Sequence, residues 1–454
     1  MPANNHLPRR LLIPLLLLTF GALPALAAKE TFYAVGAAQV DITPDYPIRL
    51  NGYGARVKES EGIDQHIYAQ ALAIGSSKRS LAIVVTVDNV AVPAHLREEV
   101  AARLAKKAGL RNERFALCST HTHTAPMLTG SCPNIFGADL PPDQQERVDR
   151  YTIELTDKLE QVALAALKAR QPATLAWGQT KAGFAANRRT KDGPVDHDLP
   201  ALVARDKSGR VRALFTSYAC HCTTLADTPN RICGDWAGYA REHLEGDHPG
   251  AIVLVALGCG ADANPNPRTG LEFATQNGNA IRTAVNELVR RPLSPLRQKL
   301  ACQTKPISLA YDTLPTREQW TALAQSDNHW IAYHAKKNLA RLDRGEKLPT
   351  RLPYLVQTWN FGQELAMVFL PGEVVVDYSL RLKKEYDPTR LWVNAYANDV
   401  PCYIPSKRIW REGGYEGGDA MIYFDRPTRL VEGTEELIVS TVHELLPPAF
   451  LAPR

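Results

Sequence analysis

Short apolar runs rich in β-branched residues alternate along this chain with amphipathic helical stretches. The strand pattern is clearest at 81–87 (LAIVVTV) and 251–257 (AIVLVAL), and helical periodicity is clearest at 96–108 and 147–170. Strands that alternate with helices form sheets covered by helices. The sequence therefore predicts an α/β fold of mixed β-sheets flanked by helices.

Further elements follow from the same patterns. Strands are predicted at 115–119, 201–205, 211–218 and 364–369. The second and third of these pair around the turn Lys207-Ser208-Gly209. The polar stretch 316–351 has a helical pattern, which indicates either a helical insertion near the functional site or a plain solvated helix pair.

The N-terminal segment has the layout of a secretory signal peptide. Arg9 and Arg10 precede an apolar core at 11–23, and Ala25-Leu26-Ala27 offers small residues for cleavage. The core is too short for a spanning helix, although an uncleaved membrane anchor is the alternative. We expect 1–27 to be removed near Ala27 and the mature chain, 28–454, to be exported to the periplasm or secreted.

Composition and missing motifs exclude several classes of protein. The formal net charge is +5, and there is no dense Lys/Arg block interleaved with aromatics, so nucleic acid is not an expected partner. The sequence has no His-Glu-x-x-His, no Gly-x-Ser-x-Gly, no Walker loop and no dinucleotide-binding glycine pattern. These absences disfavour nucleotide enzymes and the common serine hydrolases.

The eight cysteines do not form a recognisable scaffold. Eight are too few for a disulfide framework in a chain of 454 residues, and no Cys-x-x-Cys pair marks a thiolate zinc site. An exported protein can form disulfides, and either Cys118 with Cys132 or Cys222 with Cys233 is a candidate pair. The sequence leaves this open.

Histidines and carboxylates fall where predicted strands end. His121 and His123 follow one strand, and His221 follows another. Asp262 and Glu373 come soon after two more. Because ligands of open α/β sheets gather beyond the carboxyl ends of strands, we expect these side chains to converge.

The His121-x-His123 spacing favours a metal site. Two residues separated by one position point to the same side of an extended backbone. Imidazole and carboxylate are ordinary Zn²⁺ ligands, and a catalytic zinc keeps one position open for water. The alternative is a polar strand edge with satisfied hydrogen bonds, which is the commoner explanation of an isolated His-x-His.

Several short motifs occur in a characteristic order. They are Ala34–Pro44 with Asn51-Gly52-Tyr53, Thr120–Pro126 (THTHTAP), Ala186-Asn187-Arg188, His221 with Asp235, Pro371-Gly372-Glu373, and Asn394-Ala395-Tyr396 with Tyr403-Ile404 and Tyr415-Glu416. Each motif alone is weak, but the ordered set resembles the neutral/alkaline non-lysosomal ceramidases, zinc amidases that cleave the N-acyl bond of ceramide. The resemblance runs from about Val35 to about Arg429 and covers that family's catalytic domain.

The resemblance implies roles for individual residues. The positions that match the family's zinc ligands are His121, His221, Glu373 and Tyr403. His123 matches a second active-site histidine, suited to stabilising the oxyanion or moving a proton. Arg188 matches an arginine that hydrogen-bonds the polar head of the substrate.

The family's Gly-Asp-x-Ser-Pro-Asn element reads Ala-Asp-Ala-Asn-Pro-Asn here, at 261–266. Asp262 is retained, and Asn264 replaces a serine proposed as nucleophile or substrate contact. Both remain catalytic candidates, but an asparagine cannot form an acyl-enzyme. An active enzyme would therefore use a metal-activated water, with Asn264 orienting the substrate.

Three further departures concern the substrate. The segment 62–66 (GIDQH) lacks the family's Gly-Ile-His start, and a longer loop, 397–402, precedes Tyr403. The chain stops at Arg454, so we expect the family's C-terminal β-sandwich domain to be absent. That domain supports the catalytic domain and helps its approach to membranes, so its absence argues against a specialised ceramide enzyme at bilayers.

Three hypotheses follow. The first is a zinc-dependent hydrolase acting on an N-acyl amide, either ceramide, which implies peripheral membrane contact, or a smaller molecule; a metal hydrolase of a non-lipid substrate is a variant of it. The second is a metal-binding protein that lost turnover through Asn264. The third is a closed structural metal site. The ligand types also suit other first-row metals. The sequence does not indicate an oligomeric state.

Overall fold

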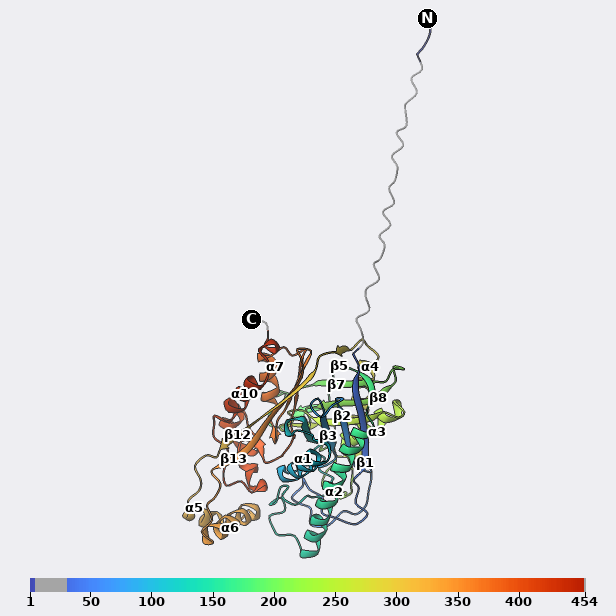
Figure 1. The fold of residues 1–454 in the computed structure, drawn as a ribbon. Helices are drawn as coiled ribbons and strands as arrows, with labels where there is room; N and C mark the ends of the chain where they lie inside the picture. The colour runs from blue at the N-terminus through green and yellow to red at the C-terminus, as the bar shows by residue number, and fades with distance from the viewer. Residues whose placement is uncertain (5–30, 453–454) are drawn as a thin grey trace. The chain divides into compact units, whose positions relative to one another are not determined.

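The structure, a computed structural model, describes residues 1–4 and 31–452 (Figure 1). The predicted signal peptide core and its cleavage position at Ala27 lie outside the described residues. Within the described part of the chain, every helix is too short or too polar to traverse a lipid bilayer.

A nine-stranded mixed sheet forms the centre of residues 31–452. Its strands follow the order β4 (Phe115–Ser119), β3 (Ala82–Val87), β2 (Tyr68–Ile74), β1 (Tyr33–Asp41), β5 (Gln171–Lys181), β7 (Asp198–Arg205), β8 (Val211–Tyr218) and β9 (Ile252–Leu257), with β11 (Ser294–Leu296) beside β5. The outer pairs β3–β4 and β8–β9 are parallel, and the other neighbours are antiparallel. The prediction of a mixed-sheet α/β fold is confirmed.

A second, four-stranded sheet packs on one face of the first. It contains β12 (Leu300–Ala310), β13 (Arg351–Phe361), β14 (Leu365–Phe369) and β16 (Leu391–Asn394). Buried apolar side chains of both sheets form one hydrophobic cluster. Within it the Phe215 ring stacks on Trp392 with centroids 4.7 Å apart, and the Trp392 indole donates to the Ser217 hydroxyl at 2.7 Å. These contacts fix the ends of β8 and β16 relative to each other.

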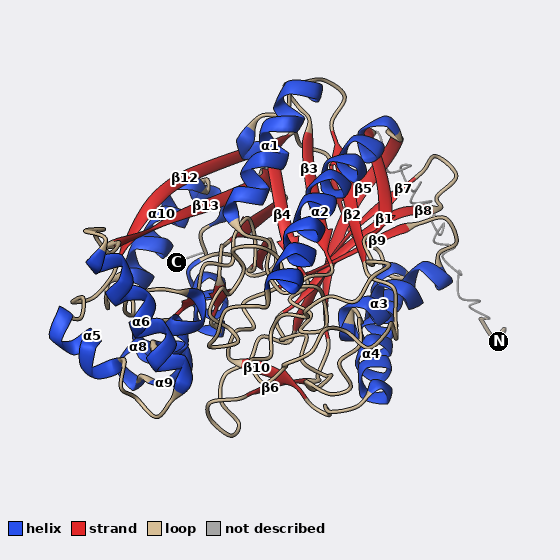
Figure 2. Cartoon of the chain, turned by 90° about the horizontal axis from the view of Figure 1, so that it is seen from below, coloured by secondary structure: helices blue, strands red, loops and turns tan. Residues whose placement is uncertain are grey.

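Helices cover the remaining faces (Figure 2). α1 (Ala94–Ala108) and α2 (Pro142–Lys168) lie over β1–β4, and α3 (Asp235–Asp247) packs beside α4 (Leu271–Val289). The others are α5 (Arg317–Leu323), α6 (His329–Asp343), α7 (Val376–Glu385), α8 (Lys407–Glu412), α9 (Gly414–Gly417) and α10 (Thr434–Leu445), with 3₁₀ turns at Asn112–Arg114, Asp419–Phe424 and Pro448–Phe450.

Two short ladders lie beyond the sheets and carry site residues. β6 (Ala185–Asn187) pairs antiparallel with β10 (Ala263–Pro265). β15 (Glu373–Val374) pairs parallel with β17 (Tyr403–Ile404). Both ladders join segments that are far apart in the sequence.

The predicted elements are present, with small shifts at their ends. The helix expected from 147 begins five residues earlier, at Pro142. Apolar periodicity starts only inside the helix, whereas a proline is well tolerated in the first turn because its missing N–H would have no partner there. The stretch 316–351 contains α5 and α6, and its end belongs to β13.

The eight cysteines are all among the described residues, buried and unbridged. Neither candidate pair, Cys118 with Cys132 or Cys222 with Cys233, is joined in the structure. Burial raises the pKa of the Cys118 thiol to about 12, so this group remains a neutral thiol at physiological pH.

Candidate metal centre

Two neighbouring segments bring the three predicted histidines together. The chain leaves β4 into the segment holding His121 and His123, and it leaves β8 into the segment holding His221. The two segments are joined by a bridge between Thr122 and Cys222, and the His123 N–H donates to the Cys222 carbonyl at 3.3 Å. The expected convergence at strand ends is therefore present for these residues.

The metal-ligating atoms of the histidines and Glu373 face one another. Glu373 Oε2 lies 3.2 Å from His121 Nε2 and 3.0 Å from His221 Nε2. His123 Nε2 lies 3.1 Å from His121 Nε2. His121, His221 and Glu373 are buried, whereas His123 is partly exposed to the cleft described below.

The protonation of these rings indicates that a cation belongs between them. His121 Nδ1 lies 2.6 Å from the Val90 carbonyl and His221 Nδ1 lies 2.9 Å from the Gly260 carbonyl. A carbonyl oxygen can only accept, so each Nδ1 carries a proton, and Nε2 of a neutral ring presents a lone pair. Burial, and then the charge of Arg188, lowers the pKa of His221 to about 4, which keeps that ring neutral at pH 7.

Three groups that can ligate a metal thus converge, and the nearest donors, Arg188 Nη1 and the Tyr403 hydroxyl, lie 3.4 and 3.5 Å from His221 Nε2. Glu373 Oε2 has no geometrically sound hydrogen bond, although it is buried beside two imidazole lone pairs. Such a group is costly unless a cation neutralises it. Imidazole nitrogen and carboxylate oxygen are the donors that divalent first-row metals prefer. The residues present therefore fit a metal ion.

The backbone around the site is specialised. His121 has φ of 56°, in the left-handed region that a non-glycine residue rarely adopts. Such conformations cost free energy and are often found at functional sites. Gly260, whose carbonyl holds His221, lies so close to Cys220 that a Cβ atom would overlap the Cys220 backbone. The positions of the His121 and His221 rings thus depend on a left-handed backbone conformation at His121 and on a glycine at position 260.

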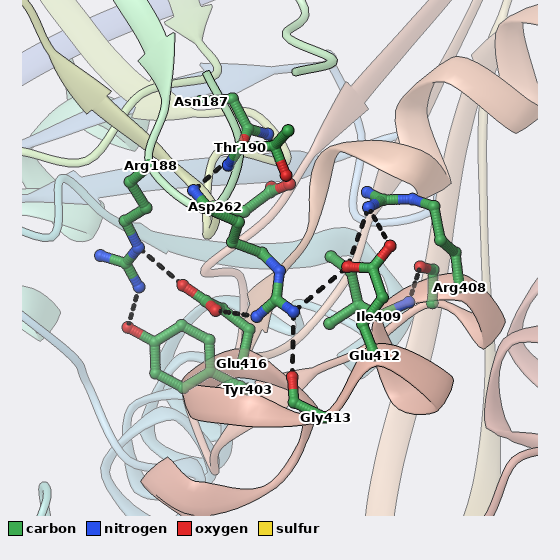
Figure 3. A network of polar contacts seen from close by, with 12 residues as sticks. Asn187, Arg188, Thr190, Asp262, Tyr403, Arg408, Ile409, Glu412, Gly413 and Glu416 are labelled. Atoms are coloured by element: carbon green, nitrogen blue, oxygen red, sulfur yellow. Dashed lines mark hydrogen bonds and ion pairs between the residues drawn. The ribbon is translucent and has the colours of Figure 1, made fainter. Parts of the chain in front are cut away.

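Tyr403 joins the site through Arg188 (Figure 3). The Arg188 guanidinium donates to the Tyr403 hydroxyl at 3.0 Å, and that hydroxyl lies 3.5 Å from His221 Nε2. Arg188 Nε also donates to Glu416 at 2.7 Å, and Glu416 binds Arg189 as well. This network places a buried phenol and a fixed cation at the edge of the metal centre.

A cleft of about 640 Å³ opens onto these groups. Its lining residues are mostly polar or aromatic: Gly52, Tyr53, His123, Arg188, Arg189, Thr190, Thr223, Asn264, Arg268, Tyr403, Glu412, Tyr415 and Glu416. Asn264 faces this cleft, and its side-chain carbonyl accepts from Thr223 Oγ1 at 3.4 Å. Gly52 permits the close approach of His123, because a Cβ atom there would lie 2.5 Å from the imidazole.

Asp262 has a different setting. One carboxylate oxygen accepts from the Val376 N–H at 2.8 Å and the other from the Asn187 amide at 3.2 Å, and its backbone carbonyl accepts from the Arg188 N–H. Burial raises the pKa of this carboxyl to about 6. The side chain thereby joins the loops that carry Glu373 and Arg188.

Other residues of the cleft have no role in the sequence-based prediction. Glu416 and Tyr415 belong to a recognised motif, but the pairing of Glu416 with two arginines is visible only in the structure. Arg268 and Thr223 lie in no motif at all. No local pattern of charges could have identified these ion pairs, because Glu416 lies more than 220 residues from Arg188 and Arg189 in the sequence.

Comparison with known proteins gives a consistent picture. Residues 33–136 match the family described as neutral/alkaline non-lysosomal ceramidase, N-terminal. Neutral ceramidase of Drosophila melanogaster is 24% identical over 260 residues, and neutral ceramidase A of Dictyostelium discoideum is 23% identical over 265 residues. These alignments cover 52% and 53% of this chain but 36% of each relative, so the chain matches about a third of the length of these relatives.

The fold extends the similarity over most of the chain. The crystal structure of neutral ceramidase from Pseudomonas aeruginosa superposes with a TM-score of 0.70 at 18% identity, covering 94% of this chain and 76% of that one. A ceramidase complexed with C2 superposes with a TM-score of 0.71, again at 18% identity, covering 94% and 78%. The chain is thus similar to the neutral/alkaline non-lysosomal ceramidases in its N-terminal region, residues 33–136, and it shares the fold of the neutral ceramidase structure through most of its length.

Proposed function

We propose that this protein is a zinc-dependent hydrolase that cleaves an N-acyl amide bond in ceramide or in a smaller N-acyl compound. The observation that carries the proposal is the buried set of acceptors formed by His121, His221 and Glu373 beside an open cleft. The relatives of similar sequence and fold are named ceramidases, which supports an amide as the bond that is cleaved.

The ligand set that we propose is His121, His221, Glu373 and Tyr403. A divalent ion held there supplies a Lewis acid and a water of lowered pKa. The side of the centre that carries His123 and Tyr403 faces the cleft, so a substrate carbonyl has access to it. This access distinguishes the proposal from a closed structural metal site, in which no position is open for water.

Two other residues are placed to stabilise charge that develops on the carbonyl oxygen. Arg188 is held by Glu416 and Tyr403, so its guanidinium needs no reorganisation when a negative charge forms nearby. His123 lines the cleft next to His121, and its Nε2 is within reach of a substrate oxygen or of a proton that must move to the leaving amine.

Amide hydrolysis can proceed through a covalent acyl-enzyme or through direct attack of water, and Asn264 bears on which of the two applies. Its side chain has neither a hydroxyl nor a thiol, so a covalent acyl-enzyme cannot form at this position. The proposed reaction is the direct attack of water on the carbonyl, with Asn264 contacting the substrate. Because the side chain faces the cleft, it is available for that contact.

The test is metal-dependent hydrolysis of defined amides. We would measure fatty-acid release from C12-ceramide and from N-lauroylethanolamine by the purified protein, before and after chelation and after addition of Zn²⁺. We expect activity that chelation abolishes and Zn²⁺ restores. His221→Ala should lose both bound metal and activity, whereas His95→Ala, which removes an exposed histidine on α1, should retain them. Full activity of metal-free protein would refute the proposal.

The location of the activity is a proposal as well. We propose that the enzyme works after export, in the periplasm or outside the cell, because residues 1–27 have the pattern of a cleaved signal peptide. N-terminal sequencing of the protein recovered from its native compartment tests this. A mature chain beginning near Ala28 supports export, and an intact Met1 in the cytoplasm contradicts it.

A further inference from the structure

Three arginines line the cleft beside the metal centre, and two of them are neutralised. Arg188 pairs with Glu416 at 2.7 Å, and Arg189 pairs with Glu412 at 3.2 Å and also with Glu416. Arg268 differs from both. Within residues 31–452, the structure gives its guanidinium no carboxylate partner and no hydrogen bond. The lining of the cleft therefore carries one positive charge without a counter-ion.

The position of Arg268 relates this charge to the reacting groups. It lies between β10 and α4, shortly after Asn264, and shares the cleft with Tyr53 and His123. The Tyr53 ring packs edge-on against His123 with centroids 5.0 Å apart. Burial, and then the charge of Asp235, raises the pKa of the Tyr53 phenol to about 12, and the charge of Arg268 acts in the opposite direction. Arg268 thus lies beside the aromatic wall of the metal centre.

A second donor accompanies this charge. The side-chain carbonyl of Asn264 accepts from Thr223, so its NH₂ group is the end left over for a ligand. Among the described residues, that NH₂ group has no acceptor. The Tyr53 hydroxyl is already engaged, because it donates to the Leu225 carbonyl at 2.6 Å. The guanidinium of Arg268 and the amide of Asn264 are therefore available to donate to a ligand in the cleft.

We propose that Arg268, together with the Asn264 amide, binds an anionic group of the substrate, a carboxylate or a phosphate, and so selects anionic N-acyl compounds over neutral ones. This inference rests on the proposed amide hydrolysis and names its substrate class. A guanidinium binds carboxylate and phosphate through paired N–H donors. A neutral lipid head would instead displace water from this charge without supplying a counter-ion, which is unfavourable.

Three probes with the same acyl chain test the proposal. They are N-lauroylglycine with a carboxylate, N-lauroyl-O-phosphoethanolamine with a phosphate, and N-lauroylethanolamine without charge. With the Zn²⁺-loaded enzyme we expect kcat/KM for at least one anionic probe to exceed that for the neutral probe by about 10-fold or more, because a charge-assisted hydrogen bond is worth that much. Equal or higher kcat/KM for the neutral probe would overturn the proposal.

Variants then assign the preference to Arg268. Arg268→Gln should lower the anionic-to-neutral ratio of kcat/KM at least ~10-fold, mainly through KM, and Arg268→Lys should restore part of it. Arg290→Gln removes the same charge from an exposed position at the end of α4 and should leave the ratio unchanged. A ratio that survives in Arg268→Gln would contradict the assignment.

Binding separates this inference from the proposed function. If the wild-type protein hydrolyses none of the three probes, amide hydrolysis fails, but binding of N-lauroylglycine can still be measured by titration calorimetry. Binding that weakens at least ~10-fold in Arg268→Gln would support the anion site without the reaction. Equal affinity of wild type and variant, or no binding to either, would overturn it.

Discussion

Glu373 and Tyr403 are register partners in the parallel ladder of β15 and β17. The Glu373 N–H donates to the Cys402 carbonyl at 3.0 Å, so backbone hydrogen bonds hold the two segments together. Partners in a ladder project to the same side of a sheet. The carboxylate that faces the two imidazoles and the phenol that contacts Arg188 are therefore positioned by one backbone feature.

The two partners should contribute unequally to metal binding. Glu373→Gln should weaken Zn²⁺ binding about 100-fold or more, since it removes the carboxylate that faces both imidazoles. Tyr403→Phe should weaken it about 10-fold, because the hydroxyl lies at the edge of the centre. Competition with a chromophoric chelator measures both affinities. Equal affinities for Glu373→Gln and wild type would show that the carboxylate is not a ligand.

Glu416 should act by positioning Arg188. Glu416→Gln leaves two arginines without their shared buried partner, so we expect a loss of about 3 kcal/mol in unfolding free energy. We also expect kcat/KM to fall at least ~10-fold, with bound metal unchanged, because the oxyanion donor is no longer fixed. Glu412→Gln removes the exposed partner of Arg189 and should cost less in both measurements. Identical losses in the two variants would contradict the positioning role.

Asn264 should not act as a nucleophile. Asn264→Ala should hydrolyse N-lauroylethanolamine with kcat within about 10-fold of wild type, since only a substrate contact is lost. Intact-protein mass spectrometry of the quenched reaction should show no acylated wild-type enzyme. A loss of several orders of magnitude in Asn264→Ala would contradict a role limited to substrate contact, and an acyl adduct would contradict the direct attack of water.

His334, a buried histidine on α6, should make stability depend on pH. Burial, the largest cause, lowers the pKa of this ring to about 4, with Asp425 opposing and Arg341 and Lys337 reinforcing the shift. A histidine with a depressed pKa in the folded state stabilises the fold above its ordinary pKa of 6.5 and loses that contribution as the pH falls through 4. By pH 4 the loss amounts to about 3 kcal/mol.

The His334→Gln variant tests this dependence. Urea unfolding at pH 7 and pH 4 should show a smaller drop in unfolding free energy for His334→Gln than for wild type. His329→Gln removes an exposed histidine from the same helix and should retain the full drop. If wild type and His334→Gln lose equal free energy over this range, another group governs the acid sensitivity.

Much of the fold was accessible from local patterns. The strand predicted at 115–119 is β4, and the strands predicted around Lys207-Ser208-Gly209 are the antiparallel pair β7 and β8. Periodicity records which residues are buried in a strand or helix, and that is a local property. It also placed His121 and His221 at strand ends, where the structure brings their rings together.

The sequence alone determined the alternating elements and the positions of histidines and carboxylates at their ends. Through a family resemblance it also indicated Tyr403 and Arg188 as candidate site residues. Only the tertiary structure showed that Glu373 and Tyr403 share a ladder, that Glu416 holds Arg188, and that Arg268 has no counter-ion among residues 31–452. The reason is physical: these relationships depend on pairings between distant segments, and the packing of the whole chain, not the pattern within any segment, decides which segments meet.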